Sequence, residues 1–261
     1  MIEWRPLSGR LGAEVAGPEG ARRLIFLHGF AQTANSWKPI AEHFVDEGYQ
    51  AVVIDLPGHA GSENVRADLR RAADMIAALG GPATYVGYSL GGRAALHVAL
   101  MYPNIVKALA VIGANPGIDN EEERARRRDS DDDLIEHLED IGVDAFLQEW
   151  VALPLFGGRA IGPLEMADRQ RNTVEGLASS LRLAGTGAQG SLWPRLREMN
   201  MPVLAMAGAN DEKYAAIAKQ IANSVPRGKC VIVPGAAHSV HLEQPEAVMA
   251  AVDDLLARLQ R

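Results

Sequence analysis

The segment Gly87-Tyr-Ser-Leu-Gly91 has the clearest capacity for chemistry, because it holds one serine between two glycines. A β-prone run from Ala83 precedes it, and a helical run, Arg93–Leu100, follows at once. Together they predict a nucleophile elbow, the sharp turn that joins a strand to a helix. The two glycines remove the side chains that would clash in so tight a turn. Ser89 is then expected at a helix N-terminus, where partial positive charge favours a developing anion.

Two residues that could activate this serine follow it in the chain. Asp211 lies in the loop after a predicted strand at 201–208, and His238 lies just after a predicted strand at 229–233. A histidine that takes the serine proton makes the hydroxyl a base or a nucleophile, and a carboxylate fixes the histidine tautomer. The order Ser, Asp, His, each just past a strand, is that of the α/β hydrolases. The sequence therefore predicts a triad of Ser89, His238 and Asp211.

Both partners have alternative interpretations. Asp211 could be the N-cap of the helix that follows it, a role that is compatible with the triad. His241 competes with His238, which we prefer because it comes first in the loop after the last strand. We expect His241 to order that loop. His28 and His59 lie in loops near the expected site, and the remaining three histidines fall in helical patterns.

An oxyanion hole is also predicted. An early strand that begins at Arg22 ends in the loop His28-Gly-Phe30. In this fold one N–H donor comes from the residue after the nucleophile, and the other comes from this loop. The backbone amides of Phe30 and Leu90 are therefore the expected donors to a developing negative charge. The alternative is that His-Gly-Phe is simply a turn.

The elements that must position these residues alternate along most of the chain. Such alternation predicts the α/β-hydrolase fold, a mostly parallel central sheet flanked by helices. After a leading hairpin at 2–16, strands are predicted at 22–28, 50–55, 83–88, 106–113, 201–208 and 229–233, and helices at 36–47, 65–79, 90–102 and 244–259. The alternation stops after the sixth strand. We expect a helical cap at 115–190, inserted into a core made of 1–114 and 191–261.

The composition narrows the class of protein. A chain of 261 residues with 48% hydrophobic and 23% charged residues suits one globular domain with an insertion. The net charge of −7 argues against nucleic acid as a partner. A single cysteine, Cys230, excludes a disulfide framework and favours a reducing compartment. The sequence does not indicate an oligomeric state and is compatible with a monomer.

The N-terminal residues lack the apolar core of a signal peptide, and no run is long enough to cross a bilayer. We therefore expect a cytoplasmic protein with no membrane partner. No cluster of metal-ligand residues appears in the sequence, so we expect neither a metal nor a cofactor.

The cap begins with residues 115–133, which are dense in charges of both signs. A solvated helix supported by i,i+4 pairs, such as Glu122–Arg126 and Glu123–Arg127, accounts for most of them. This interpretation leaves open whether one face of the arginines turns toward the serine.

From about residue 24 to 246 the chain resembles the 2-succinyl-6-hydroxy-2,4-cyclohexadiene-1-carboxylate synthases, lyases of menaquinone biosynthesis with the α/β-hydrolase fold. Some matching motifs recur in many α/β hydrolases, namely Leu27-His-Gly-Phe30, Asp55-Leu-Pro-Gly-His59 and the elbow itself. More particular to the synthases are Arg93 on the elbow, Glu123-Arg124 with Arg127, and the run Gly185-Thr-Gly. The chain departs from the family at Ala60, Val151 and Gly190, where glycine, tyrosine and proline are usual or frequent.

The resemblance implies elimination rather than hydrolysis. Ser89 would remove a ring proton next to a ketone, and pyruvate would be expelled from a small-molecule polycarboxylate without a metal or an organic cofactor. The residues implied to bind this substrate are Arg93, Arg124, Arg169, Tyr88 and Trp150. Planar guanidinium groups bind carboxylates in a bidentate manner, so the arginines are assigned to the carboxylates.

Two other functions remain open. A serine hydrolase, either an esterase or a carbon–carbon bond hydrolase, would use the same triad through an acyl-enzyme. A non-catalytic relative that only binds a ligand is disfavoured by the intact triad. The arginines discriminate between these functions, because a general esterase gains nothing from three cations in its cleft. The fold by itself decides none of this.

Overall fold

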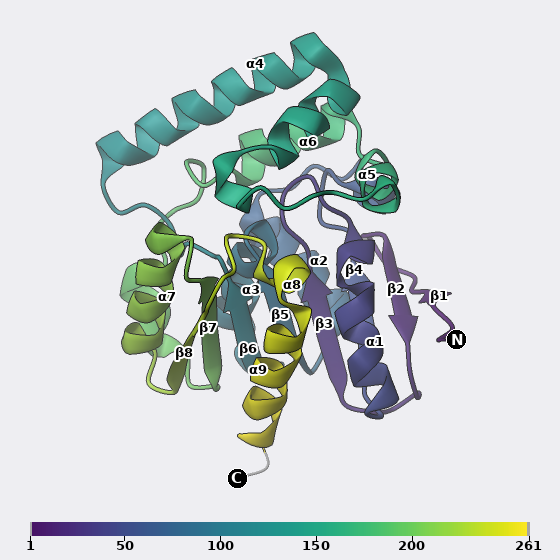
Figure 1. Ribbon diagram of the computed structural model, residues 1–261. Helices are drawn as coiled ribbons and strands as arrows, with labels where there is room; N and C mark the ends of the chain where they lie inside the picture. The colour runs from purple at the N-terminus through teal and green to yellow at the C-terminus, as the bar shows by residue number, and fades with distance from the viewer. Residues whose placement is uncertain (1, 260–261) are drawn as a thin grey trace.

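The central sheet has the strand order β1-β2-β4-β3-β5-β6-β7-β8 in the computed structural model, which describes residues 2–259 (Figure 1). Strand β2 pairs antiparallel with β1 and β4, and the remaining pairs are parallel. The strands are β1 (Arg5–Pro6), β2 (Ala13–Ala16), β3 (Arg23–Leu27), β4 (Gln50–Ile54), β5 (Ala83–Tyr88), β6 (Val106–Ile112), β7 (Val203–Gly208) and β8 (Gly228–Val233). The predicted mostly parallel sheet with a leading hairpin is confirmed.

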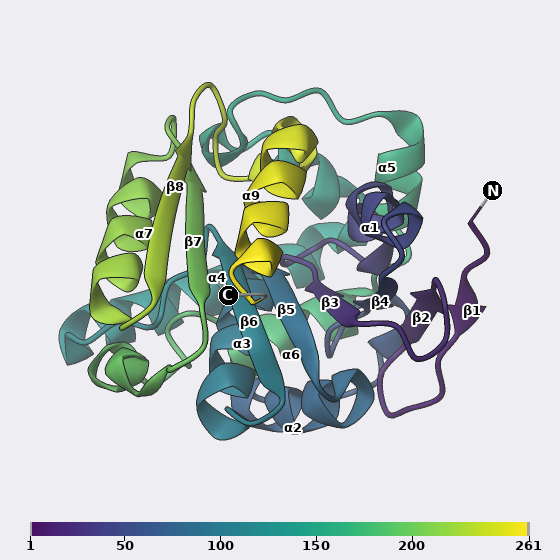
Figure 2. The same cartoon turned by 90° about the horizontal axis from the view of Figure 1, so that it is seen from below.

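Helices cover both faces of the sheet, as Figure 2 shows from below. One face packs against α2 (Leu69–Gly80), α3 (Leu90–Met101) and α7 (Glu212–Ser224), whose buried side chains form one hydrophobic cluster with the strands. The other face packs against α1 (Lys38–Asp46) and α9 (Pro245–Ala257) in a second cluster. A short helix, α8 (Val240–Glu243), precedes α9. The two clusters pack the strands tightly on both faces. The residues that directly follow the strands are therefore held in fixed positions relative to one another.

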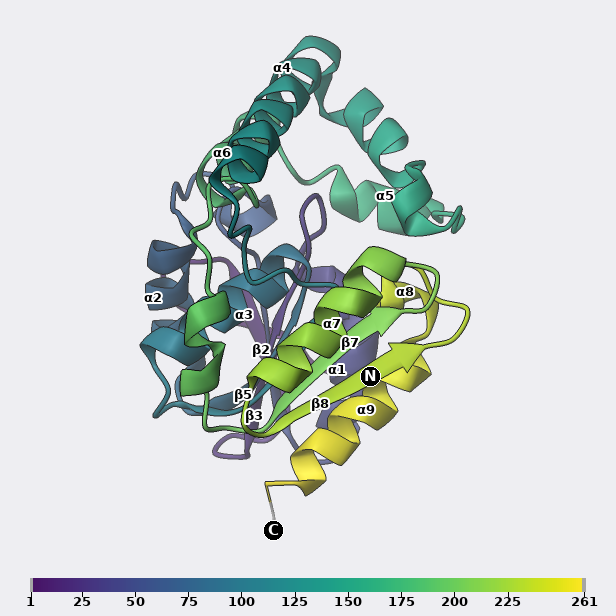
Figure 3. The ribbon, with the colours of Figure 1, turned by 90° about the vertical axis from the view of Figure 1, so that its left-hand side faces the viewer.

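Three helices lie between β6 and β7, above the carboxyl ends of the parallel strands (Figures 1 and 3). They are α4 (Glu121–Val151), α5 (Pro163–Arg169) and α6 (Val174–Ala184). Gly142, with φ 78° and ψ 166°, interrupts the helical geometry of α4. A third hydrophobic cluster joins α4 to α6 and also contains Ala31, from the loop after β3. The helical cap expected after the sixth strand is therefore present, and its core includes a residue of the sheet's own loops.

Two predicted helices differ from the structure at their N-termini. The helix expected from residue 65 begins at Leu69, because Asp68 is extended and its carboxylate caps the helix by accepting from the Arg71 N–H at 2.8 Å. The helix expected from residue 36 begins at Lys38, after a short 3₁₀ helix at Ala34–Trp37. A capping interaction decides the first residue of α2, and a preceding 3₁₀ helix, capped by Thr33, shifts the start of α1. Hydrophobic spacing reports neither feature.

The turn between β5 and α3 depends on the absence of side chains. Ser89 has φ 49° and ψ −109°, a region that non-glycine residues rarely occupy. A Cβ added to Gly87 would lie 2.5 Å from the carbonyl carbon of Gly91, and one added to Gly91 would lie 2.6 Å from the carbonyl oxygen of His28. The backbones of β3, β5 and α3 therefore approach one another as closely as the elbow requires.

We expect Gly91→Ala to destabilise the protein strongly, because the new methyl group would meet rigid backbone. Overpacking of this kind typically costs about 1–3 kcal/mol, and more where backbone must move. Gly190→Ala is the matched control, since nothing lies within 4 Å of a Cβ built there. Chemical denaturation of both variants measures the free energy of unfolding. Equal values for the two would show that the close approach at Gly91 is not a constraint.

Candidate active site

Ser89, Asp211 and His238 meet where β5, β7 and β8 end. His238 Nδ1 lies 2.7 Å from Asp211 Oδ2, and His238 Nε2 lies 3.4 Å from Ser89 Oγ. The carboxylate accepts a hydrogen bond from Nδ1–H. This keeps the proton on Nδ1 and leaves Nε2 available as the base that takes the serine proton. The histidine and the aspartate are only 4% and 7% exposed. The structure thus brings the three predicted triad residues together, in a geometry where the Ser–His contact is still loose.

Both interpretations of Asp211 are compatible in the structure. One carboxylate oxygen, Oδ2, faces His238, while Oδ1 accepts a hydrogen bond from the Tyr214 N–H at 3.2 Å and caps α7. The Tyr214 ring also packs 4.5 Å from the His238 ring, measured between centroids. Because a helix N-terminus and a ring both restrain it, the Asp211–His238 pair has little freedom to turn.

Ser89 and His238 line a cavity of about 770 Å³, part of which is open to solvent. The core contributes Phe30, Gln32, Tyr88, Leu90, Arg93 and Tyr214, and the cap contributes Arg127, Trp150, Phe156, Arg169, Ser180 and Thr186. The cap therefore supplies about half of the wall against which a ligand of the serine would lie.

The two predicted oxyanion donors belong to residues that line this cavity. Leu90 is the first residue of α3, and the first N–H groups of a helix have no acceptor within it. Phe30 lies in the loop after β3, and its ring packs edge-on against Trp150 with 5.2 Å between centroids. Both positions are those that the sequence predicted, and the role of their amides stays a prediction.

Tyr88 and Trp150, predicted to line the pocket, also lie in its wall. The Tyr88 hydroxyl is 3.0 Å from Ser239 Oγ, and its ring lies so close to Gly29 that an added Cβ there would be 2.6 Å from a ring carbon. Trp150 stacks on Phe146 of the same helix with 5.8 Å between centroids. Tyr88 therefore shapes the core side of the cavity and Trp150 the cap side.

Arg93 enters the cavity from α3 and is only 8% exposed. Its Nη1 donates to the carbonyl of Ala184 at 2.7 Å and to Gln189 Oε1 at 3.2 Å. Both acceptors are neutral. Burial lowers the pKa of the Arg93 guanidinium to about 10, so the group still carries its charge at neutral pH. A buried cation held by neutral acceptors is well placed to receive an anionic ligand.

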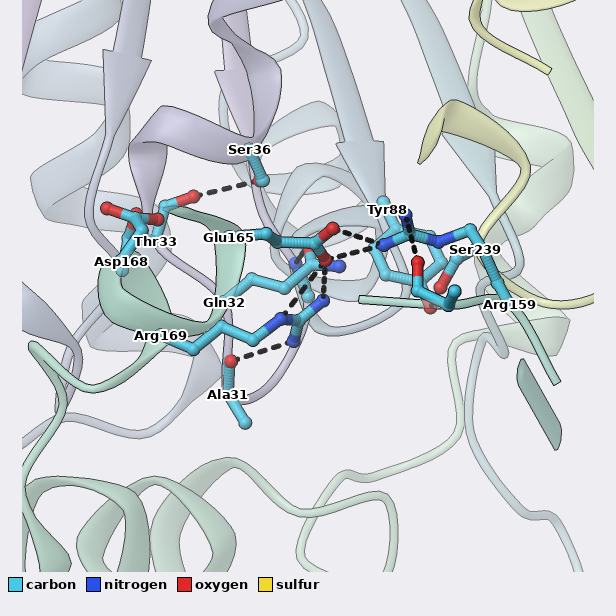
Figure 4. A network of polar contacts seen from close by, with 12 residues as sticks. Ala31, Gln32, Thr33, Ser36, Tyr88, Arg159, Glu165, Asp168, Arg169 and Ser239 are labelled. Atoms are coloured by element: carbon cyan, nitrogen blue, oxygen red, sulfur yellow. Dashed lines mark hydrogen bonds and ion pairs between the residues drawn. The ribbon is translucent and has the colours of Figure 1, made fainter. Parts of the chain in front are cut away.

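Arg169 also lines the cavity, but a carboxylate already holds it. Figure 4 shows Glu165 between Arg169 and Arg159. Arg169 Nη2 and Nε donate to Glu165 Oε1 at 2.9 and 3.3 Å, and Nη1 donates to the carbonyl of Ala31 at 3.0 Å. The charge of Arg169 is therefore shared with an internal partner, in contrast to that of Arg93.

The structure does not bring Arg124 into the cavity, and Arg127 lies there instead. Arg124 pairs with Glu121 and donates to the carbonyl of Ile118 at 3.3 Å, so its guanidinium faces the start of α4. Arg127 Nε donates to Asp131 Oδ1 at 2.8 Å. The expected pairing of Arg127 with Glu123 is replaced by this contact.

Within the described residues, the expected Glu122–Arg126 pair is absent as well. Arg126 is exposed, and the ion pairs of this turn are made with Glu121, which Arg128 contacts at 3.1 Å. Sequence spacing alone did not identify Arg127 as the residue in the cavity. Its place in the family motif, three residues after Arg124, was the available signal.

His241, the rival to His238, does not line the cavity. Its ring packs between Tyr88 and Trp37, with centroids 4.3 and 4.6 Å away. Burial, together with the Arg169 charge, holds the pKa of His241 well below its usual range, so the ring is neutral. The expectation that His241 orders the loop after β8 stays a prediction.

His28 and His59 hold the loop that carries Phe30. His28 Nε2 accepts from the Leu56 N–H at 2.9 Å, and Nδ1 therefore donates to the Gly29 carbonyl at 2.7 Å. His59 Nε2 accepts from the Ala31 N–H at 3.3 Å. Complete burial lowers the pKa of His28 to about 4 and that of His59 to about 3. Both rings are neutral and serve as backbone acceptors, a role that the sequence did not reveal.

Within residues 2–259 no group of three or more His, Cys, Asp or Glu side chains could hold a metal ion. In the same part of the chain, no helix combines the length and the apolar character needed to span a membrane.

Comparisons with known proteins identify the family to which the chain belongs. The model of the alpha/beta hydrolase family matches residues 24–251. The 2-succinyl-6-hydroxy-2,4-cyclohexadiene-1-carboxylate synthase of Salmonella paratyphi C (strain RKS4594) is 32% identical over 250 residues, which cover 92% of this chain and 96% of the relative. The structure of MenH from S. aureus superposes with a TM-score of 0.83 at 31% identity and covers 95% of this chain and 99% of that one.

A malate-bound thermophilic esterase from Thermogutta terrifontis has a TM-score of 0.81 and covers 99% of this chain and 100% of its own. Its identity to this chain is 21%. At that level the likeness shows a shared fold and nothing about the reaction.

The neutral, buried His28 predicts that mild acid destabilises the protein. Its pKa is about 4 in the folded state and 6.5 ordinarily, so between these values the unfolded chain binds a proton that the folded chain does not. The free energy of unfolding should then fall as pH falls, by about 1.4 kcal/mol per pH unit for this group.

His28→Gln, which keeps an acceptor for Leu56, should remove the contribution of this one group to the slope of unfolding free energy against pH. The buried His59 and His241 still contribute to that slope. His43→Gln removes a histidine that lies near the protein surface and serves as the control. Denaturation across this pH range measures both slopes, and an unchanged slope in His28→Gln would exclude His28 as the titrating group.

Proposed function

We propose that this chain, which belongs to the α/β hydrolase family and within it to the 2-succinyl-6-hydroxy-2,4-cyclohexadiene-1-carboxylate synthases, eliminates pyruvate from 2-succinyl-5-enolpyruvyl-6-hydroxy-3-cyclohexene-1-carboxylate. The product is 2-succinyl-6-hydroxy-2,4-cyclohexadiene-1-carboxylate, and the enzyme is a carbon–oxygen lyase of menaquinone biosynthesis. The ligand is a small molecule with three carboxylates. The net charge of −7 disfavours nucleic acid, and the unpaired cysteine fits a reducing cytoplasm.

The observation that carries this proposal is the set of guanidinium groups around the triad. Arg93, Arg127 and Arg169 line the same cavity as Ser89. A substrate with three carboxylates would match three cations, and each charge-assisted contact would also fix its orientation. An ordinary ester substrate offers no such charge. Arg93 is the strongest candidate, because its present acceptors are neutral.

The first step is removal of the ring proton next to the ketone. His238 takes the Ser89 proton through Nε2, and the serine oxygen removes the ring proton. Asp211 stabilises the imidazolium that results. The positive end of α3, which begins directly after Ser89, favours the negative charge on the serine oxygen.

The electron pair released from the C–H bond moves to the ketone oxygen and forms an enolate. The amides of Phe30 and Leu90 would donate to this oxygen, as they would to the oxyanion of an acyl transfer. When the enolate collapses, its electrons shift through the ring double bond and break the carbon–oxygen bond between the ring and the enolpyruvyl group. The leaving group departs as the enolate of pyruvate. The proton that His238 took from Ser89 balances its conversion to pyruvate, while Ser89 keeps the proton from the ring, so the triad returns to its starting state.

The cap belongs to this mechanism. We propose that residues 115–190 act as a cap on a core formed by 1–114 and 191–261, since Arg127, Trp150 and Arg169 reach the cavity from it. These side chains would hold the substrate carboxylates and exclude water from the enolate. Exclusion of water also disfavours hydrolysis, which the same triad could otherwise perform.

We expect Ser89→Ala to lose pyruvate release while the fold is retained. Loss of a general base lowers kcat by ~10²–10⁴. Ser224→Ala is the control, because that hydroxyl bonds the Gln220 carbonyl at the end of α7 and lies outside the cavity. Pyruvate release from the enolpyruvyl substrate is the measurement, and near wild-type release by Ser89→Ala would remove the serine from the mechanism.

The second candidate is a serine hydrolase, which the Ser–His–Asp geometry favours. A hydrolase would show a burst of product with a p-nitrophenyl ester and a covalent adduct on Ser89 by mass spectrometry. A synthase should turn over such esters poorly and accumulate no acyl-serine. The two outcomes separate base catalysis from nucleophilic catalysis at the same oxygen.

The arginines give a second, independent prediction. Arg93→Ala and Arg127→Ala should each lower kcat/KM, since a charge-assisted contact is worth about 1.5–3 kcal/mol. Arg93→Lys should rescue poorly, because a point charge does not reproduce the fork. Arg126→Ala, at an exposed position, is the control.

Arg124→Ala should have a smaller effect than Arg127→Ala, because the Arg124 guanidinium pairs with Glu121 outside the cavity. Equal and mild effects at all of these positions would remove the main support for a polycarboxylate substrate.

A further inference from the structure

We propose that Asp168, on the cap helix α5, is a positioning residue that holds the oxyanion loop, residues 28–33, in its working conformation. It does so through Thr33 and Asn35, which follow β3. This inference rests on the proposed function, because the loop matters only if the Phe30 amide receives the enolate oxygen.

The oxyanion loop needs external support. Ala31 is fully buried and has φ 57°, a left-handed conformation that costs energy for a residue with a Cβ. Such a conformation persists only where the surroundings determine it. The N–H of Phe30 lies in the Gly29–Phe30 peptide, one unit before the peptide that joins Phe30 to Ala31, so a relaxation of Ala31 would displace the segment that carries the donor.

Asp168 contacts the end of this loop with both carboxylate oxygens. Oδ2 accepts a hydrogen bond from Thr33 Oγ1, and Oδ1 accepts one from Asn35 Nδ2 at 2.6 Å (Figure 4 shows Asp168 beside Thr33). Arg171 adds an ion pair to Oδ1 at 3.0 Å. The side chain is 19% exposed, so solvent competes little for these charge-assisted bonds.

Two neighbours of Asp168 continue the pattern along the loop. Arg169 Nη1 donates to the carbonyl of Ala31 at 3.0 Å, and Asn172 Nδ2 lies 3.5 Å from the carbonyl of Gln32. Residues 31, 32 and 33 are thus contacted in succession from α5 and the turn that follows it. The cap therefore supports the conformation of the oxyanion loop as well as covering the cavity.

Asp168 is the member of this group that separates positioning from substrate binding. Arg169 lines the cavity of Ser89, whereas Asp168 does not. Loss of Asp168 should displace the Phe30 amide and leave the carboxylate-binding arginines in place. The expected signature is a fall in kcat with little change in KM, because the displaced donor acts on the enolate and not on the bound carboxylates.

The test measures pyruvate release by Asp168→Ala, Thr33→Val, Thr33→Ser and the double variant Thr33→Val/Asp168→Ala. Asp168→Ala and Thr33→Val should lower kcat by about 10-fold or more, as misplacement of a catalytic donor does. Thr33→Ser keeps the hydroxyl and should resemble the wild type.

The double variant should lose less activity than the product of the two single effects, because both single changes remove the Thr33–Asp168 contact, although Thr33→Val also removes the acceptor of the Asn35 N–H. Asp144→Ala is the matched control. Asp144 Oδ1 accepts a hydrogen bond from Gln170 Nε2 at 3.0 Å, so this carboxylate contacts the same segment as Asp168 but on its exposed side. Its kcat should equal that of the wild type.

The outcomes separate the two proposals. A wild-type enzyme that releases no pyruvate would overturn the proposed function, and the positioning role with it. An active wild type whose kcat is unchanged in Asp168→Ala, or whose KM alone rises, would overturn only the positioning role. If Asp168→Ala does not fold, equal kcat in Thr33→Val and Thr33→Ser overturns it.

Discussion

The approach of three backbones at the elbow determines where the other parts of the site can lie. Gly91 packs so closely against the end of β3 that the first residues after β3 run beside the first turn of α3. One proposed oxyanion donor, Leu90, begins that turn, and the other proposed donor, Phe30, lies in the segment that leaves β3. The contact that permits the turn at Ser89 therefore also makes the two amides neighbours. Asp211, which follows β7, and His238, which follows β8, complete the candidate site. The same sheet holds both strands in register.

The charges of the cavity are arranged unequally around this centre. Arg93 meets only neutral acceptors, whereas Arg127 and Arg169 each have an acidic partner within the cap, Asp131 and Glu165. A buried cation whose hydrogen bonds go to neutral acceptors raises the free energy of the empty site, and an anion that binds it relieves this cost. A carboxylate at Arg93 gains the most from binding, and those at the cap arginines must share their partner with an internal acid. In the proposed function the core would therefore supply the stronger anchor for the substrate, and the cap would add contacts around it.

Local patterns predicted the parts of the site that follow strands. Ser89, Asp211 and His238 each come directly after a β-prone run, so their convergence follows from the rule that parallel strands end at one edge. Arg127 was not distinguished from Arg124 in this way. Two arginines one turn apart on a helix dense in charges have the same local pattern, and their ion pairs with Glu121 and Asp131 decide which one enters the cavity.

Contacts between distant segments were the least predictable. Asp168 lies 135 residues from Thr33, and neither residue belongs to a motif that names the other. The start of α2 was missed for the opposite reason, because it depends on one cap at Asp68 that overrides a wider hydrophobic pattern. Sequence periodicity reports which face of an element is buried, but it does not report what lies across from that face.

The presence of Ala31 in the hydrophobic cluster of the cap has a consequence for engineering and for the evolution of this fold. A cap whose core contains only its own side chains could be exchanged between relatives as a module. Here Ile135, Leu138 and Leu177 pack in one cluster with a residue of the β3 loop. A chimera that receives a foreign insertion after β6 would keep Ala31 in a position that packs against the side chains of the original cap. Successful exchange requires that the loop after β3 be transplanted together with the insertion, as one discontinuous unit.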